Sequence, residues 1–164
     1  MCIRDRYYGK QWYIVVESGG PKMFMGEYHH NMDDKQRLVI PSNYRSSLGE
    51  TFIVTRGLEK CLYIYTQTEW QKIVDKLNSL PFTKKDARVF IRSFFSAAAN
   101  CNLDRQGRIN ITSQQAVYAD LKKECIIIGA NDRIEIWSKE NWDKFNEEYM
   151  ESLESVAENL FNGE

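Results

Sequence analysis

The chain has 164 residues and a mass of 19.3 kDa, which suits one domain or two small repeats that share a core. Its 22 Lys and Arg residues against 23 Asp and Glu give a net charge of −1, which excludes a uniformly basic protein but permits a local basic patch. A hydrophobic content of 43% with 3 Pro and 9 Gly favours a folded chain over a disordered one, and no apolar run suggests a membrane span.

Residues 1–22 precede a second plausible start at Met23 and resemble a translated sequencing adapter followed by an untranslated leader. The run Trp12–Val16 has the composition of a short strand, but Gly19-Gly20-Pro21 would break the chain directly after it. We therefore expect residues 1–22 to be a non-native N-terminal extension, and we derive the fold from residue 23 onward.

The main signal beyond residue 22 is an internal repeat. Residues 31–42 align with residues 102–113 at an offset of 71, and Asn, Asp, Arg, Ile and Ser recur identically. Residues 62–70 align with residues 134–142 at an offset of 72, so one extra residue lies in a connecting loop. Two matching blocks in the same order indicate a tandem duplication. We expect a first repeat with helices over 23–95, a second repeat over 96–142 and an acidic C-terminal helix over 143–164.

In each repeat a polar turn leads into a strand with alternating side chains. Leu38 and Ile40 alternate with Arg37 and Val39, and the second copy repeats the pattern over 108–111. A period of two places the apolar pair on one strand face and the arginine on the other. Further β-rich runs are expected over Phe52–Thr55, Leu62–Tyr65, Cys125–Ile128 and Ile134–Trp137.

Helices are expected after the last strand of each repeat. Thr66–Glu69 fits a capping box, and the helix that follows ends before Pro81. Residues 83–98 form a second helix whose apolar face has a basic flank, which is most simply a solvated surface. After Ser138, apolar residues recur at gaps of three and four as far as Leu160. These stripes indicate core or subunit interface rather than a cofactor site.

No cofactor, metal or enzyme site is expected. Cys2, Cys61, Cys101 and Cys125 have no zinc-binding spacing, and the adjacent histidines at 29 and 30 lack a third ligand nearby. An acid–base pair formed by the aspartates at 33 and 104 is possible, but neither has the apolar surroundings that would separate two pKa values. Cysteines outside any disulfide framework and the lack of a secretory signal pattern predict a cytoplasmic protein.

The repeated Asp-x-x-x-Arg turn is the best functional candidate. A turn favours Asp because its carboxylate accepts backbone N–H bonds, and the arginine fork can bind phosphate or the edge of guanine. A two-stranded ribbon that carries such arginines can enter the major groove. The simpler alternative is that Asp33 and Arg37 only pair across their own turn. Duplication of the whole element favours a role in DNA binding, because symmetric DNA half-sites suit symmetric protein elements.

Several motifs together resemble the MraZ family of bacterial transcription regulators: Met23–Tyr28, both turns, Thr55–Leu58, Leu80-Pro81 and Arg133–Trp137. The resemblance covers essentially residues 23–142. It implies an α+β fold, namely an AbrB-like swapped-hairpin β-barrel formed by the two tandem repeats of one chain, with packed helices. It also implies a ring-shaped homo-oligomer, associated with the nucleoid. Members bind double-stranded DNA at short direct repeats upstream of their own division and cell-wall gene cluster.

By the same resemblance, the DNA-binding residues are Asp33, Lys35, Arg37, Asp104, Arg105, Gln106 and Arg108. Gln36 replaces the family's glycine, so a left-handed turn costs about 1–2 kcal/mol and we expect a distorted first hairpin. Gln106 replaces the family's lysine and removes one charge. Alanine at Arg37 or Arg108 should weaken DNA binding and change stability by no more than about 0.5 kcal/mol. The alternative function is a ring-forming structural or interaction module with incidental DNA contact, which the nearly neutral charge supports.

Overall fold

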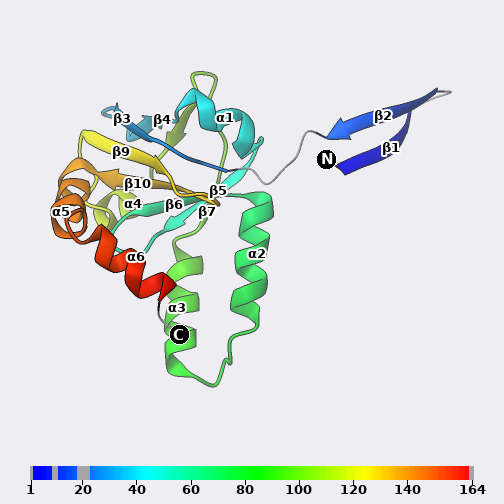
Figure 1. The fold of residues 1–164 in the computed structure, drawn as a ribbon. Helices are drawn as coiled ribbons and strands as arrows, with labels where there is room; N and C mark the ends of the chain where they lie inside the picture. The colour runs from blue at the N-terminus through cyan, green and yellow to red at the C-terminus, as the bar shows by residue number, and fades with distance from the viewer. Residues whose placement is uncertain (1, 9–10, 18–22, 163–164) are drawn as a thin grey trace.

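The β-rich runs and amphipathic helices of the two repeats assemble into layers in the computed structural model (Figure 1). The structure describes residues 2–8, 11–17 and 23–162. These residues form three antiparallel sheets, of two, six and two strands, and six helices, so the fold is of the expected α+β class. Among the described residues, no helix combines the length and apolar character that a bilayer crossing needs.

Eight strands lie in the described part of the chain from residue 23 onward, and six of them coincide with predicted strands, whereas the first strand of each repeat was not predicted. They are β3 (Glu27–Asn31), β4 (Arg37–Val39), β5 (Phe52–Arg56) and β6 (Leu62–Thr66) in the first repeat, and β7 (Ala99–Cys101), β8 (Arg108–Asn110), β9 (Glu124–Gly129) and β10 (Ile134–Ser138) in the second. Two further strands, β1 (Cys2–Tyr8) and β2 (Gln11–Glu17), pair with each other in the segment that we expected to be an extension. Figure 1 shows this hairpin apart from the other elements.

The two repeats exchange strands in the six-stranded sheet. Its order is β3-β9-β10-β6-β5-β7, which is symmetric once each strand is matched with its counterpart in the other repeat. At one end β3 pairs with β9, with Tyr28 opposite Ile127, and at the other end β7 pairs with β5, with Asn100 opposite Ile53. The central strands β6 and β10 also come from different repeats. Neither repeat therefore completes its half of the sheet by itself.

The exchange does not produce a closed barrel. In the described part of the chain, β3 and β7 end the six-stranded sheet and no sheet closes on itself. The expected barrel is therefore not established by this strand order. A separate ribbon joins β4 to β8, one strand from each repeat, with Leu38 opposite Ile109.

Side chains alternate along the central strands and enter two cores. Ile64 belongs to the same core as Leu38 and Ile109, between the sheet and a layer made of the β4–β8 ribbon, α1 (Ser42–Leu48) and α4 (Ser113–Tyr118). Tyr65 points to the opposite face, in a core shared with α2 (Gln67–Asn78), α3 (Lys85–Ser96) and α5 (Lys139–Tyr149). Both faces are covered, so every residue of β6 and of β10 is buried.

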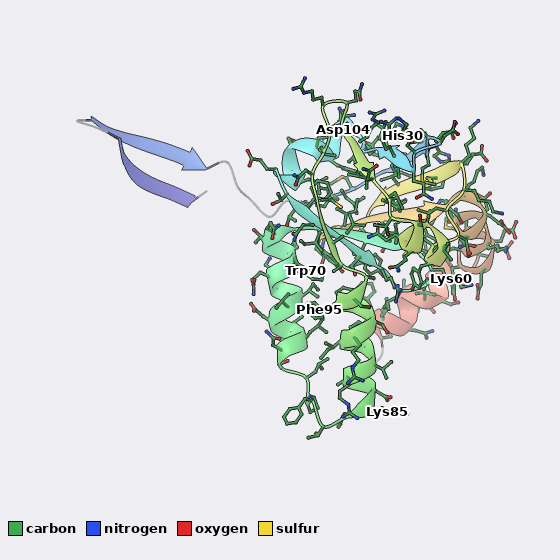
Figure 2. All side chains as sticks on the ribbon, turned by 180° about the vertical axis from the view of Figure 1, so that it is seen from behind. His30, Lys60, Trp70, Lys85, Phe95 and Asp104 are labelled. Atoms are coloured by element: carbon green, nitrogen blue, oxygen red, sulfur yellow. The ribbon has the colours of Figure 1, made fainter. Side chains whose placement is uncertain are left out.

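Aromatic stacking holds α2 and α3 together as an antiparallel pair. Trp70 stacks on Phe94 with ring centroids 5.5 Å apart, and Phe95 meets Trp70 edge-on at 5.5 Å. Figure 2 shows Trp70 and Phe95 pointing toward each other between the two helices. It also shows Lys85, at the outer tip of this pair, at the opposite end of the molecule from Asp104. The predicted aromatic stripes are therefore core here.

Helix α2 begins where the sequence predicted, but with only half of the expected capping box. The Thr66 hydroxyl accepts the Glu69 amide at 3.2 Å, whereas the Glu69 carboxylate accepts Lys72 Nζ at 2.8 Å instead of returning to the cap. The complete capping box lies at α4, where the Thr112 hydroxyl accepts the Gln115 amide at 3.1 Å and Gln115 Oε1 accepts the Thr112 amide at 3.0 Å.

The expected single C-terminal helix is two helices, α5 and α6 (Leu153–Phe161). Both the amide and the hydroxyl of Ser152 donate to the carbonyl of Tyr149 at 3.2 Å. A serine that bonds to a nearby carbonyl in this way competes with the bonds that would continue the helix. The apolar stripe that predicted one helix is therefore divided at 150–152, and α6 contains no buried residue.

Candidate nucleic-acid interface

The β4–β8 ribbon brings together the two Asp-x-x-x-Arg turns, which start 71 residues apart in the chain. Each turn also bonds to the strand of the other repeat. The Ile40 amide donates to the Gly107 carbonyl at 2.9 Å, and the Ile111 amide donates to the Gln36 carbonyl at 2.8 Å. Because each repeat supplies one strand and one turn, the site exists only when both halves of the chain are folded together.

Each aspartate organises its own turn in the same way. Asp33 Oδ1 accepts the amides of Lys35 and Arg37, both at 2.9 Å, and Oδ2 accepts Nε of Arg37 at 2.7 Å. Asp104 makes the same three bonds in the second turn, at 2.9, 2.9 and 2.8 Å. The simpler alternative, a pairing of aspartate and arginine across the turn, is therefore present in the structure. This pairing uses only Nε of each arginine, so the two Nη atoms are not part of it.

All seven predicted site residues lie on this ribbon and its turns. Lys35, Arg105 and Gln106 are exposed at the tips, and Arg37 and Arg108 are half-buried beside them. The arginines emerge from the strand face opposite the core, as the alternation predicted. The sequence therefore identified a set of residues that the tertiary structure brings to one place.

Both aspartates are held in the ionised form. The hydrogen bond from the Arg37 amide lowers the pKa of the Asp33 carboxyl below its usual 3.8. Burial opposes this shift, and the hydrogen bond from the guanidinium of the same residue adds to it. The amide of Arg108 lowers the pKa of Asp104 in the same way. A general acid at neutral pH needs a raised pKa, so these shifts oppose the acid–base pair considered from the sequence. The two carboxylates act as fixed acceptors that shape the turns.

The fourth position of each turn has left-handed backbone, with φ of 57° at Gln36 and 74° at Gly107. We expected Gln36 to distort the first turn, but the matching hydrogen bonds of the two turns agree within 0.1 Å, so this expectation is wrong. The Gln36 side chain borders a shallow depression that it shares with Ala116 of α4, and its Oε1 accepts the Ser113 hydroxyl at 3.4 Å. Because the Ala116 side chain is small, the Gln36 side chain fits beside it.

The second turn lacks that room. Arg45, which occupies in α1 the position that Ala116 occupies in α4, places its guanidinium against Gly107, and its Nε donates to the Ile40 carbonyl at 2.8 Å. A Cβ atom on Gly107 would overlap the guanidinium carbon. Glycine at this turn is therefore favoured by its positive φ, and a larger residue would also have to displace the end of the Arg45 side chain.

Sequence reasoning missed three asparagines next to the arginines. A depression of about 340 Å³ is lined by Asn100, Asn102 and Asn110 together with Arg37 and Arg108. Asparagine amides donate and accept at once, which suits the edge of adenine. Asn102 recurs between the two repeats and was detectable in that way, whereas Asn100 and Asn110 carried no sequence signal.

The candidate metal ligands do not gather. His29 Nε2 bonds to the Glu27 carboxylate at 3.0 Å, in a partly exposed pair within β3. Cys61 and Cys125 are buried in different cores. Across residues 2–8, 11–17 and 23–162, no three His, Cys, Asp or Glu side chains are grouped to hold a metal ion.

Comparison with known families agrees with the two-repeat architecture. The sequence model of the family described as "MraZ protein, putative antitoxin-like" matches the chain twice, over residues 23–93 and again over residues 94–163. The two matches meet within α3, near its C-terminal end, and each includes one of the two turns. The tandem duplication inferred from the offsets is therefore a duplication of one family domain.

Proposed function

The chain belongs to the MraZ family, and we propose that it is a DNA-binding transcription regulator that acts in the cytoplasm, associated with the nucleoid. The observation that carries the proposal is the β4–β8 ribbon, which presents two Asp–Arg turns side by side. By its resemblance to the family, the DNA site is a set of short direct repeats upstream of its own division and cell-wall gene cluster.

The ribbon has the form that the major groove accepts, since that groove admits two paired strands. Leu38 and Ile109 are 0% and 1% exposed, so the alternation of side chains directs Arg37 and Arg108 away from the core. Guanidinium forks in this position suit the edge of guanine or a phosphate, and the exposed basic side chains at the tips suit phosphate.

The strand exchange supports the swapped-hairpin arrangement that the resemblance implies. Each repeat gives its first strand to the sheet of the other repeat, and the β4–β8 ribbon again takes one strand from each. We treat residues 23–95 and 96–142 as the two AbrB-like repeats and residues 143–164 as an acidic extension.

We also propose a ring-shaped homo-oligomer built through α3 and α6. Helix α3 exposes Val89 and Phe90 beside a basic flank, and α6 exposes Leu160 and Phe161 beside acidic residues. The two faces are apolar and of opposite charge, so α6 of one copy suits α3 of the next. A contact between two different surfaces repeats from copy to copy and closes into a ring when the rotation allows.

The direct test is a gel-shift experiment with duplex DNA from the region upstream of the chain's own gene. We expect binding that weakens as salt rises, because arginine and lysine contacts to phosphate release counterions. Binding to unrelated duplexes with equal affinity, or no binding at low salt, would contradict the proposal. Either result with an intact ring would favour the alternative, a ring-forming structural or interaction module.

A spacer series tests the role of the ring. One chain offers two short turns and makes few phosphate contacts, so a single DNA repeat should bind weakly. A ring that engages several repeats gains a factor of about 10² to 10⁴ from effective concentration. Affinity should fall steeply when the spacing of two repeats is shifted by half a helical turn. Equal affinity for one repeat and for several would exclude the multivalent mechanism.

A further inference from the structure

The two turns share their backbone geometry but hold their arginines differently. In the first turn Arg37 is bonded within the protein through Nε alone, to Asp33 at 2.7 Å, as far as the described residues show. In the second turn all three guanidinium nitrogens of Arg108 face acceptors. Nε bonds to Asp104 at 2.8 Å, Nη2 bonds to Gln106 Oε1, and Nη1 lies 3.8 Å from Asp33 Oδ2.

The residue two places after the aspartate explains this difference. Gln106 carries a carbonyl oxygen that accepts a bond from Arg108. The first turn has Lys35 at the same position, which has three donors and no acceptor and therefore cannot hold a guanidinium. Exposure follows the same order, because the Arg37 side chain is 30% exposed and that of Arg108 is 22% exposed.

We propose that Gln106 is a positioning residue that keeps Arg108 on the protein, so that Arg37 makes the stronger DNA contact of each chain. This inference rests on the proposed function of the ribbon in DNA binding. A duplex that binds Arg108 must replace its bond to Gln106 and weaken its ion pair with Asp33, whereas the two Nη atoms of Arg37 are ready for a bidentate contact. The difference lies in the arginines and not in the number of basic side chains at the tips, because the first turn has Lys35 and the second has Arg105.

If the two turns contribute unequally to DNA affinity, the recognised DNA site is asymmetric. If both arginines contributed equally, the ribbon would read a site with twofold symmetry, because its two strands come from matching positions of the two repeats. With one strong and one weak turn, the base pairs under Arg37 determine specificity more than those under Arg108. Base substitutions in one half of each DNA repeat should therefore cost more affinity than the equivalent substitutions in the other half.

The first experiment compares single variants on a duplex that carries two DNA repeats, by fluorescence anisotropy at fixed salt. Arg37→Ala should lower affinity by about tenfold or more, as for the loss of one bidentate contact, and Arg108→Ala by less than about threefold. In a Gln106→Met background the loss caused by Arg108→Ala should rise toward that of Arg37→Ala. Equal losses for the two arginines in the unmodified protein would overturn the inference while leaving the proposed function intact.

A matched pair of variants separates positioning from a structural role. Gln106→Met removes the acceptor and should raise affinity, whereas Lys35→Met, at the same position of the first turn, removes a charge and should lower it. A purely structural role of Gln106 would give a loss in both cases. Nitrogen-15 NMR of the DNA-free protein gives a second readout, in which Gln106→Met should speed hydrogen exchange at the Arg108 guanidinium and leave that of Arg37 unchanged. An unmodified protein that binds no DNA would instead contradict the proposed function, and unchanged exchange at Arg108 would contradict the inference on its own.

Discussion

Replacing Gly107 with alanine should lower the free energy of unfolding by about 2–3 kcal/mol. Left-handed backbone costs a residue with a Cβ about 1–2 kcal/mol, and Gly107 has φ of 74°. The new Cβ would also displace the Arg45 guanidinium, which then loses the bond from its Nε to the Ile40 carbonyl, at about 1 kcal/mol. The two costs arise at one site but have separate causes, so a second substitution can separate them.

The assay is equilibrium denaturation in guanidinium chloride at one fixed protein concentration, with the midpoint and slope fitted together. Arg45→Ala alone should cost about 1 kcal/mol, and adding Gly107→Ala in that background should cost only the backbone component. Gln36→Gly is the matched control in the first turn. It should stabilise the protein by as much as about 1 kcal/mol, because glycine adopts the left-handed backbone at less cost and Ala116 makes no contact like that of Arg45. Additive effects of Gly107→Ala and Arg45→Ala, or a destabilised Gln36→Gly variant, would refute this account of the turn.

Four further predictions concern the two turns, the N-terminal segment and a buried cysteine. Folding lowers the pKa values of Asp33 and Asp104, so the two carboxylates stabilise the protein above about pH 4, and this contribution is lost as the pH falls through the lowered values. Asp→Asn at either position should therefore reduce the difference in stability between about pH 7 and about pH 3. Arg37→Ala should change stability by about 0.5 kcal/mol, as for an exposed pair at i,i+4, while its effect on DNA affinity is much larger; a large fall in melting temperature with DNA affinity intact would give the residue a structural role. Deleting residues 1–22 should leave the melting temperature and DNA affinity unchanged, and an insoluble product would show that this segment belongs to the fold. Burial raises the pKa of Cys125 to about 11, so a thiol reagent at pH 8 should modify it slowly in the native protein and rapidly in denaturant.

Much of the local structure was predictable because local chemistry sets it. Leu38 alternates with Arg37, and this spacing alone indicated which side chain enters the core and which leaves it. The turn was predictable for a similar reason, since an aspartate carboxylate bonds to amides two and four residues further along the chain. The error at Gln36 has a nonlocal cause, because the room for its side chain comes from Ala116, 80 residues away in sequence.

The outer strands β3 and β7 and the short helices α1 and α4 were not predicted from the sequence. The sequence by itself determined the duplication, the strands β4–β6 and β8–β10, the amphipathic helices α2 and α3, and the residues of the two turns. These features depend on side-chain alternation, helix caps and turn chemistry within a few residues, and each half shows them independently. Only the tertiary structure decided which strands the halves exchange, that the Arg45 guanidinium packs against Gly107 and that Gln106 bonds to Arg108. Strand exchange buries the apolar faces of β4 and β8 in one core. This core needs both repeats, so the residues near each strand in the sequence do not predict it. The contacts that distinguish the two turns join positions that become neighbours only when this shared core has formed.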